Sequence, residues 1–355
     1  MNPETFHIIG GGIAGLACAL AVANKGHEAI VLEKADKFDP IGAGLQLGPN
    51  AVRALQQLGA WDAVSPITSS PSEIQIRNGV NGKILKCIPL GKSFEQRFGQ
   101  TYRVAHRADL VQALLQVAKA KPLITIKTNS EVLDITAYEN VIAADGVWSK
   151  TRQTLFPGSA AIVTKEIFYR ALAPSFKSNC VTLWLFPGGH VVHYPIGNPA
   201  KLNLVAITQG LTPDLHFANA CDELKQTLAE ANWTTWPAAY VPPLKQWNQG
   251  NTILIGDAAH GTLPYLAQGA AMALEDAANL GKILGAELPV AVVFERLSTL
   301  RSKRTRKLHA ASWRSGRLYH SSGIAAAARN FVLQATPSNL LLQKMAWIYN
   351  QKTDH

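Results

Sequence analysis

The chain has 355 residues, of which 47% are hydrophobic and 16% charged, so it can bury one large or two modest cores and is not a disordered polymer. The net charge of +10 would suit nucleic acid or an anionic membrane, but the densest basic cluster, residues 301–307, has no aromatic side chains interleaved with it. We therefore expect a solvated helix face there, no nucleic-acid partner, no stable membrane insertion and a general attraction for small anionic ligands.

The first element expected is half of a dinucleotide-binding fold at residues 6–33, FHIIGGGIAGLACALAVANKGHEAIVLE. An apolar strand leads into a glycine turn, a small-residue helix and a second strand that ends at Glu33. Gly10, Gly12 and Gly15 have the G-x-G-x-x-G order, which gives a tight turn, close approach of a pyrophosphate and close helix packing. A carboxylate at Glu33 holds ribose hydroxyls and disfavours a 2′-phosphate, so this stretch predicts FAD or NAD rather than NADP.

The next part of the chain inserts β structure between further pieces of this fold. In order we expect a glycine-dense loop at 42–49, a helix at 51–58, hairpin strands within 72–90, a helix at 106–120, a strand at 123–127, a buried strand at 141–146 and a helix at 150–155.

The second half repeats this alternation. We expect strands at 181–186, 191–196 and 202–207 with a turn at 187–189, a helix at 217–231, a Trp- and Pro-rich passage at 233–243, a strand at 252–255, and then helices broken at Pro289 and Pro337. The whole order predicts an interleaved α/β fold. Its parts are a Rossmann-like nucleotide-binding domain of residues 1–70, 100–160 and 245–300, a β-sheet substrate domain of 71–99 and 161–244, and C-terminal helices at 301–355.

A carboxylate follows the strand at 252–255. Asp257 lies where strand carboxyl ends open onto the ligand crevice of an α/β sheet, and it can accept sugar hydroxyls there; the alternative is a simple helix N-cap. Beyond it, Pro264 and a Gln268-Gly269 turn precede a strongly helical run. The positive end of that helix would stabilise an anionic reduced flavin.

The cysteines and the N-terminus bear on compartment and metal binding. Cys18, Cys87, Cys180 and Cys221 are widely scattered, with no C-x-x-C pair and no histidine at metal-ligand spacing. We expect reduced thiols, no metal site, no targeting signal and a cytoplasmic protein.

Three separated motifs resemble a known family. GGGIAG at 10–15, AADG at 143–146 and GDAAH at 256–260 occur in the order seen in single-component, FAD-dependent aromatic-ring monooxygenases. Further similar stretches are GAGLQLGPNAVRAL at 42–55, HRADL at 106–110 and LAQGAAMALEDAANL at 266–280. Together they cover nearly the whole chain, and they look most like the salicylate hydroxylase branch, which includes enzymes acting on hydroxybenzoates and hydroxynicotinate.

The resemblance implies a resident FAD. Gly12 and Glu33 would hold its ADP part, Arg107 and Asp257 its ribityl and pyrophosphate region, and segments 42–48 and 264–270 would face the flavin ring. The full set of implied FAD-binding residues is Gly10, Gly12, Ala14, Gly15, Glu33, Lys34, Gly44, Leu45, Arg107, Asp145, Gly146, Asp257, Pro264, Gly269 and Ala270. The zone of Asp145 and Gly146 would be shared with the reductant. One departure from the branch is the short piece between 128 and 141, where we expect a hairpin bordering the adenosine to be missing.

The expected chemistry follows from the resemblance and from what the chain lacks. Since there is no second glycine fingerprint, NADH or NADPH would bind transiently as co-substrate. No metal ligands are needed, because reduced flavin activates O2 as a C4a-hydroperoxide. The protein would exclude water and hold an electron-rich ring.

The stretch GGHVVHYP at 188–195 supplies the substrate candidates. On a strand, His190 and Tyr194 share one face and His193 points to the other. The resemblance gives His190 and Tyr194 substrate-contacting and catalytic roles, in which a neutral histidine orients or accepts a phenolic proton. The alternative is a strand histidine satisfied by backbone. Weaker substrate candidates are Tyr265 and Gln268, while Tyr169 and Arg170 resemble a position near flavin and reductant.

We therefore expect an FAD-dependent NAD(P)H monooxygenase that hydroxylates a small, anionic aromatic or heteroaromatic substrate, as a monomer or homodimer. One alternative is a hydroxylase of a larger quinone-like or polycyclic substrate. Another is a non-catalytic flavin-binding regulator that uses the basic helix at 301–307. A halogenase of this fold would carry a W-x-W-x-I-P motif, which the chain does not contain.

Overall fold

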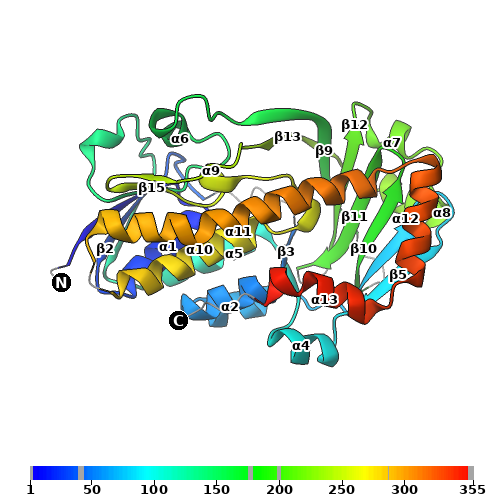
Figure 1. Cartoon of the computed structure of the whole chain (residues 1–355), viewed down its shortest axis with the longest axis horizontal. Coiled ribbons are helices and arrows are strands. Elements are labelled where there is room, and N and C mark those ends of the chain that lie inside the picture. The colour runs from blue at the N-terminus through cyan, green and yellow to red at the C-terminus, as the bar shows by residue number, and fades with distance from the viewer. Residues whose placement is uncertain (1–2, 39–43, 175–178, 198–200, 287, 351–355) are drawn as a thin grey trace.

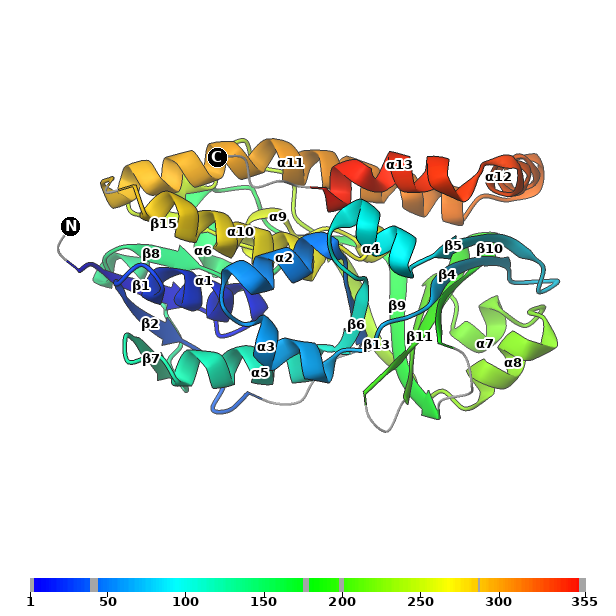
Figure 2. The ribbon, with the colours of Figure 1, turned by 90° about the horizontal axis from the view of Figure 1, so that it is seen from below.

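The computed structural model describes residues 3–38, 44–174, 179–197, 201–286 and 288–350. Two sheets lie side by side, and three C-terminal helices run along one side of both (Figures 1 and 2). A six-stranded sheet has the order β14-β15-β8-β1-β2-β7, and a seven-stranded sheet has the order β13-β9-β12-β11-β10-β4-β5. A two-stranded ribbon, β3 with β6, completes the strands found in the described residues.

The six-stranded sheet is parallel apart from its edge strand β14. Its strands are β1 (Thr5–Ile9), β2 (Glu28–Leu32), β7 (Ile124–Lys127), β8 (Val141–Ala143), β14 (Asn248–Gln249) and β15 (Thr252–Leu254). Ala143 pairs with Ile9 on one side and with Leu254 on the other. The three glycine-containing motifs that follow β1, β8 and β15 therefore lie together at one edge of the sheet.

Helices pack on this sheet and bury apolar faces. They are α1 (Ile13–Ala23), α2 (Pro49–Gln57), α3 (Trp61–Val64), α5 (Arg107–Lys119), α6 (Lys150–Leu155), α9 (Asp257–His260) and α10 (Gly269–Leu284). Helix α1 is made almost entirely of buried small and aliphatic residues. Small side chains allow the helix to lie close to both β1 and α10.

The seven-stranded sheet has different cover on its two faces. Its strands are β4 (Glu73–Asn78), β5 (Ile84–Pro89), β9 (Ile162–Pro174), β10 (Cys180–Phe186), β11 (Gly189–Ile196), β12 (Lys201–Gln209) and β13 (Thr234–Tyr240). A cluster containing Trp184, Val191 and Phe217 packs one face against α7 (Pro213–His216) and α8 (Asp222–Ala229). The other face lies toward the nucleotide-binding motifs and the C-terminal helices.

The C-terminal helices are α11 (Val290–Tyr319), α12 (Gly323–Ala335) and α13 (Ser338–Tyr349). Pro289 and Pro337 stand at the N-caps of α11 and α13, as the breaks at these prolines predicted. In the part of the chain that the structure describes, no helix combines the length and apolar character needed to cross a bilayer.

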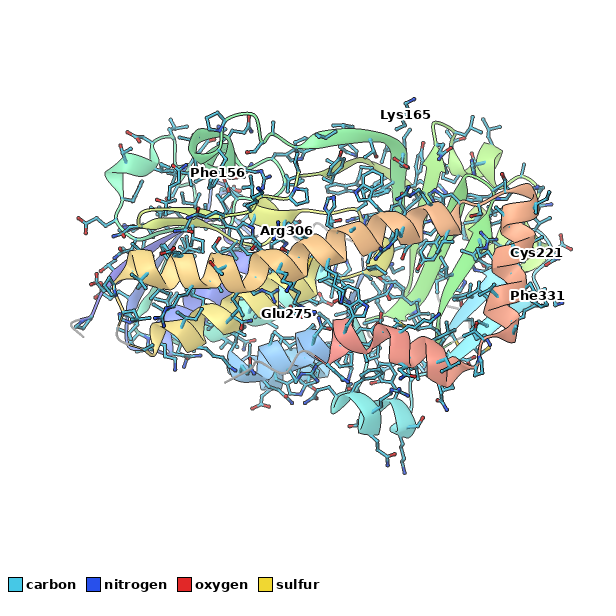
Figure 3. The ribbon with its side chains drawn as sticks, viewed as in Figure 1. Phe156, Lys165, Cys221, Glu275, Arg306 and Phe331 are labelled. Carbon is cyan, nitrogen blue, oxygen red and sulfur yellow. The ribbon has the colours of Figure 1, made fainter. Side chains whose placement is uncertain are left out.

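The expectation of a solvated face at 301–307 is wrong for two of its arginines. Arg301 is fully buried and pairs with Glu275 and Asp276 of α10, each at 2.7 Å. Arg304 also binds Glu275 and donates to the main-chain carbonyls of Trp347 and Ile348 in α13. Figure 3 shows Glu275 where α10 passes beneath α11. These cations join three helices instead of facing solvent.

Four further elements differ from expectation. The helix expected at 217–231 is shorter and begins only at Asp222 as α8, because the Cys221 amide before it donates to the Gly79 carbonyl; the separate short helix α7 ends before residue 217. The Trp- and Pro-rich passage forms β13, an edge strand whose register shifts next to Pro237, where an edge tolerates proline. Part of the glycine-dense loop forms β3 (Gly44–Leu47), which pairs with β6 (Arg103–His106). Helix α4 (Lys92–Phe98) was not expected.

The connection between β7 and β8 is short, as noted from the sequence. It contains a 3-10 turn at Ile135–Ala137 and no strand.

Candidate functional site

The glycine turn after β1 gives each glycine a distinct environment. Gly10 has a φ of +100°, and a Cβ there would lie 2.6 Å from the Ala144 carbonyl oxygen. A Cβ on Gly15 would lie only 1.9 Å from the Gly10 carbonyl oxygen, so this glycine lets helix pack on strand. A Cβ on Gly12 would have no atom within 4 Å. Space is therefore left at the one glycine where a pyrophosphate would approach.

The N-terminus of α1 fits an anionic group. Gly12 is its N-cap, and no side chain accepts a hydrogen bond from the first turn. Uncapped N–H groups and the positive helix end form an anion site. Ala14 packs against the turn of the GDAAH motif, since a Cβ on Gly256 would lie 2.9 Å from the Ala14 Cβ.

Glu33 is held in place at the end of β2. Its carboxylate accepts hydrogen bonds from the Gly11 amide at 2.6 Å and the Ala35 amide at 2.9 Å. Carboxylate oxygens can accept further hydrogen bonds, so these two leave capacity for ribose hydroxyls. Lys34 is exposed. The hydrogen bond and charge of Lys150 lower the pKa of the nearby Glu131, and the charge of Lys34 lowers it slightly further.

The turn after β8 presents an open acceptor. Gly146 has a φ of +80°, and Asp145 Oδ2 accepts from the Thr151 amide at 3.2 Å. Asp145 Oδ1 is buried without a protein partner. A buried acceptor of this kind fits a ligand hydroxyl or amide, because leaving it unsatisfied is costly.

The turn after β15 faces the start of α10. Gly256 has a φ of +60°, and Asp257 is exposed. A Cβ on Gly269 would lie 4.0 Å from Asp257 Oδ1, so the carboxylate stands beside the N-terminus of α10. Gly269 and Ala270 are half-buried, and no side chain caps this helix. Its dipole therefore points into the region that the sequence assigned to the flavin.

Arg170 of β9 connects the two sheets electrostatically. Burial lowers its pKa, Tyr194 and Asp257 raise it, and Arg107 lowers it further. Tyr194, Asp257 and Arg107, which come from three other stretches of sequence, therefore lie close enough to Arg170 to influence its charge. Arg170 Nε is buried without a hydrogen-bond partner. Arg107 itself is exposed at the start of α5.

His190 is buried on β11 and its partner is another imidazole. His190 Nδ1 lies 2.8 Å from Nε2 of His320, which directly follows α11. Burial, and secondarily His320, lower the pKa of His190 well below its usual value, so the ring is neutral at physiological pH. The rings of Tyr265 and Tyr319 lie 5.7 and 5.4 Å from it. The alternative of a histidine satisfied by backbone does not describe this contact.

Tyr194 shares the face of His190 but has different neighbours. It is buried near Gly44 of β3 and Asn203 of β12, and it belongs to a cluster with Tyr102 and Tyr349. His193 lies on the opposite face beside the Trp184 ring, as the alternation predicted. The structure thus places His190 and Tyr194 along one wall, in separate groups of contacts.

The segment Pro264–Leu266 lies between the nucleotide edge and this wall. Pro264 is exposed, and Tyr265 packs on Gly316, where a Cβ would lie 2.5 Å from the Tyr265 ring. Leu266 packs against the cluster that contains Tyr194. Ala267 has a φ of +51°, an uncommon conformation for a residue with a Cβ, just before α10.

The side-chain oxygen of Gln268 has a protein partner. Gln268 is buried, and its side-chain oxygen accepts from Asn50 of α2 at 3.0 Å; Asn50 also donates to Glu275 at 2.7 Å. This places the Gln268 oxygen in the contact between α2 and α10.

Several residues at the site were not singled out from the sequence. They are Gln46, Tyr102, Tyr319, His320 and Tyr349, of which the last three come from the C-terminal helices. Tyr102 donates to Gln46 at 2.5 Å. A tyrosine next to a histidine at 319–320 is the only sequence signal that could have indicated this region. Gly42 and the rest of 39–43 lie outside the described residues, whereas Gly44 and Leu45 form the start of β3.

Comparisons with known proteins agree with this arrangement. The family described as FAD binding domain matches residues 4–140 and 216–314. The chain is 33% identical over 389 residues to 3-hydroxybenzoate 6-hydroxylase of Polaromonas naphthalenivorans strain CJ2, covering 98% of this chain and 96% of the relative. It is 29% identical to 3-amino-4-hydroxybenzoate 2-monooxygenase of Streptomyces cremeus, covering 97% and 94%.

Solved structures share the fold. Klebsiella pneumoniae HpxO in complex with FAD and uric acid matches with a TM-score of 0.85 at 20% identity, covering 96% of this chain and 95% of that one. A salicylate hydroxylase substrate complex matches with a TM-score of 0.81 at 24% identity, covering 99% and 96%. The family resemblance and fold class expected from the motifs are confirmed.

Proposed function

Because this chain belongs to the FAD binding domain family, among its aromatic-ring hydroxylases, we propose that it uses FAD, NAD(P)H and O2 to hydroxylate a small anionic aromatic or heteroaromatic compound. The observation that carries the proposal is the position of segment Pro264–Leu266. It leads into α10 at the nucleotide edge while Tyr265 contacts His190 and Leu266 packs near Tyr194. Relatives named for hydroxybenzoate and aminohydroxybenzoate support the substrate class.

The residues at the sheet edge fit FAD. The open space at Gly12 and the uncapped α1 would receive the pyrophosphate, and Glu33 the adenosine ribose. Asp257 and Arg107 would hold the ribityl and pyrophosphate region, with the uncapped start of α10 at the ring. When bound, FAD would carry electrons from the nicotinamide to O2, so that one oxygen atom of O2 enters the substrate and the other leaves as water.

His190 would orient the phenolic proton of the substrate. For its Nε2 to accept that proton, the ring hydrogen must sit on Nδ1 and be donated to His320 Nε2. Burial lowers the pKa of both rings, that of His320 to about 4, and so opposes a permanent imidazolium. A hydrogen bond that polarises the phenol, rather than a lasting proton transfer, is the step this pair performs.

The wall around His190 excludes water. Tyr265 and Tyr319 lie beside it, Leu263 packs in the same cluster as these two rings, and His190 itself is 2% exposed. A dry site protects a reactive oxygen donor from futile breakdown and strengthens each hydrogen bond to the substrate.

The nicotinamide is proposed as a transient co-substrate, supported by the single glycine fingerprint.

The cytoplasm is the proposed compartment, supported by four free cysteines. The domain limits given above are also kept as a proposal: each sheet draws its strands from the interleaved segments assigned to it.

The proposal is tested by a screen of phenolic, aminophenolic and pyridine carboxylates with the purified holoprotein. We expect one class of compound to stimulate NADH or NADPH oxidation and to yield a hydroxylated product by mass spectrometry. Oxygen consumption measured with and without catalase distinguishes coupled hydroxylation from release of peroxide. If no compound stimulates oxidation, or if all the oxygen consumed returns as peroxide, the flavin-binding regulator is the better interpretation.

A further inference from the structure

The positive charge of this protein is concentrated in its last 55 residues. Residues 301–355 contain ten Lys and Arg and one acidic residue, a net charge of +9. Residues 1–300 contain 24 Lys and Arg and 23 Asp and Glu, a net charge of +1. Within the described residues 296–350 there is no Asp or Glu. The rest of the molecule is thus almost neutral, and the C-terminal helices carry the charge.

Much of this charge lies on the outer side of the helices. Arg301 and Arg304 are used internally, and Arg329 donates to the carbonyls of Leu318 and Tyr319. Seven other cations are exposed: Arg296, Lys303, Arg306, Lys307, Arg314, Arg317 and Lys344. Figures 1 and 2 agree that α11, α12 and α13 lie on the same side of the molecule, so these cations belong to one face.

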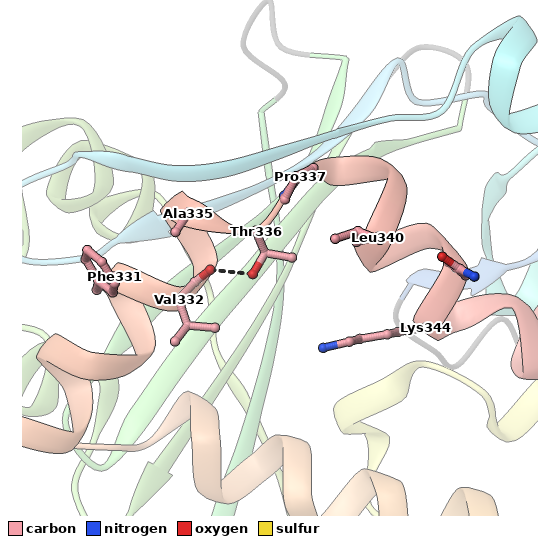
Figure 4. A pocket seen from close by; sticks show the side chains of 8 residues that line it. Phe331, Val332, Ala335, Thr336, Pro337, Leu340 and Lys344 are labelled. Carbon is pink, nitrogen blue, oxygen red and sulfur yellow. Dashed lines mark hydrogen bonds between the residues drawn. The ribbon is translucent and has the colours of Figure 1, made fainter.

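The same face exposes large apolar side chains. Helix α12 has no buried residue, and its Ile324 and Phe331 are 91% and 72% exposed. Leu318, Val332 and Leu340 are also exposed. Between α12 and α13 lies an open hollow of about 630 Å³ with apolar walls, and Figure 4 shows Lys344 pointing into it. Exposed apolar side chains flanked by cations, without acids, have the composition of an interfacial membrane-binding surface.

We propose that the outer face of α11, α12 and α13 docks reversibly on an anionic lipid bilayer. The apolar side chains of α12 enter the interface, and the exposed cations of α11 and α13 contact acidic headgroups. A second copy of this chain fits less well, because two such faces would repel. Nucleic acid would leave Ile324 and Phe331 without a partner. The inference is independent of the proposed substrate.

The test is sedimentation of the FAD-loaded protein with vesicles. We expect it to sediment with vesicles of phosphatidylcholine containing phosphatidylglycerol, to stay in solution with pure phosphatidylcholine, and to be released by salt. Replacing two exposed cations of α11, Lys303→Gln with Arg314→Gln, should weaken binding about tenfold or more. The double variant Ile324→Asp, Phe331→Asp should weaken vesicle binding by a similar factor, because it places charges where apolar side chains would enter the interface. Both side chains are exposed, so the substitutions leave the core intact.

Matched controls keep the net charge and the apolar loss constant. Lys119→Gln with Lys127→Gln removes two cations from α5 and β7, on the opposite side in Figure 2. Leu133→Asp with Leu215→Asp replaces two leucines that are 82% and 67% exposed and lie outside these helices. Both controls should bind vesicles like the parent.

Absence of sedimentation with acidic vesicles would overturn the proposal, as would equal loss in the controls. Light scattering that shows a dimer abolished by the α12 variant, without vesicle binding, would assign the face to a second copy. Retention by DNA but not by vesicles would assign it to nucleic acid.

Discussion

At His190, burial and a neighbouring imidazole act in the same direction: both lower the pKa and keep the ring neutral. A buried histidine on an apolar strand is usually satisfied by backbone, but here Nδ1 meets His320. In the proposed reaction the ring hydrogen of His190 sits on Nδ1 and is donated to His320, so His320 is a positioning residue.

Replacing His320 with alanine tests this role. Since His320 helps to lower the pKa of His190 and excludes water from it, the variant should raise that pKa toward its usual 6.5. The acidic limb of the kcat profile should then move to higher pH, because His190 becomes protonated earlier as pH falls. We expect kcat to fall about tenfold or more with KM less affected. Steady-state kinetics across pH provide the measurement.

His309→Ala is the control, because His309 lies on α11, the helix that His320 follows, and it packs against Trp313 rather than His190. An unshifted pH profile in His320→Ala would contradict the positioning role.

Glu33→Arg should yield protein poor in FAD. The arginine cannot accept hydrogen bonds from the Gly11 and Ala35 amides or from ribose hydroxyls, and its charge sits where a carboxylate stood. An affinity loss of about tenfold or more is expected, measured by flavin absorbance of the purified protein and by titration with FAD. Glu28→Arg makes the same change at an exposed carboxylate at the other end of β2; it is the matched control and should stay yellow. Full FAD retention in Glu33→Arg would refute the assignment.

At the scale of an element, α1 illustrates how one motif serves both fold and cofactor. The glycines before and within α1 differ in what surrounds them, although the sequence presents them as one pattern. Gly15 is closed by the backbone of Gly10, whereas Gly12 faces open space. Packing of the helix and binding of the ligand can therefore be separated by two alanine substitutions.

Gly12→Ala and Gly15→Ala are expected to fail differently. Gly15→Ala forces a Cβ to within 1.9 Å of the Gly10 carbonyl oxygen and should lower the free energy of unfolding of the apoprotein by about 1–3 kcal/mol or more. Gly12→Ala should leave apoprotein stability nearly unchanged but weaken FAD binding. Urea unfolding of apoprotein and FAD titration measure the two effects. A Gly12→Ala variant that binds FAD normally would mean that the pyrophosphate lies elsewhere.

At the scale of the whole molecule, a buried network of charges joins the nucleotide-binding sheet to the C-terminal helices. Burial by itself raises the pKa of Asp276, but His260 and Arg301 lower it below its usual value. His260 belongs to the GDAAH motif and binds Asp276 at 2.5 Å, while Arg301 belongs to α11. The motif that positions Asp257 is thereby linked to the helix that carries His320.

Arg301→Met should destabilise the protein strongly. It leaves Glu275 and Asp276 buried with fewer cations, a loss that typically costs about 3–5 kcal/mol. Urea unfolding followed by far-UV circular dichroism gives the free energy of unfolding. Lys303→Met, two residues away and exposed, is the matched control and should change it by about 0.5 kcal/mol or less. A loss below about 1 kcal/mol in Arg301→Met would show that the network contributes little.

The sequence by itself determined the nucleotide edge and most elements, because local signals carry them. The glycine pattern at 10–15, the alternation along 188–195 and the prolines at 289 and 337 each act through backbone geometry within a few residues. The structure has the expected turn, the expected two faces of β11 and the expected helix starts. The assignment of site residues to FAD and substrate remains a prediction.

Only the tertiary structure decided which distant side chains meet. β3 became a strand because β6 pairs with it, and α8 begins where it does because the Cys221 amide binds Gly79. Arg301 looked like surface charge until α10 supplied two carboxylates. His320 became part of the site because α11 spans both sheets. Periodicity and motifs report what a residue does to its own backbone, whereas partners far away in the sequence are selected by packing, which no local pattern encodes.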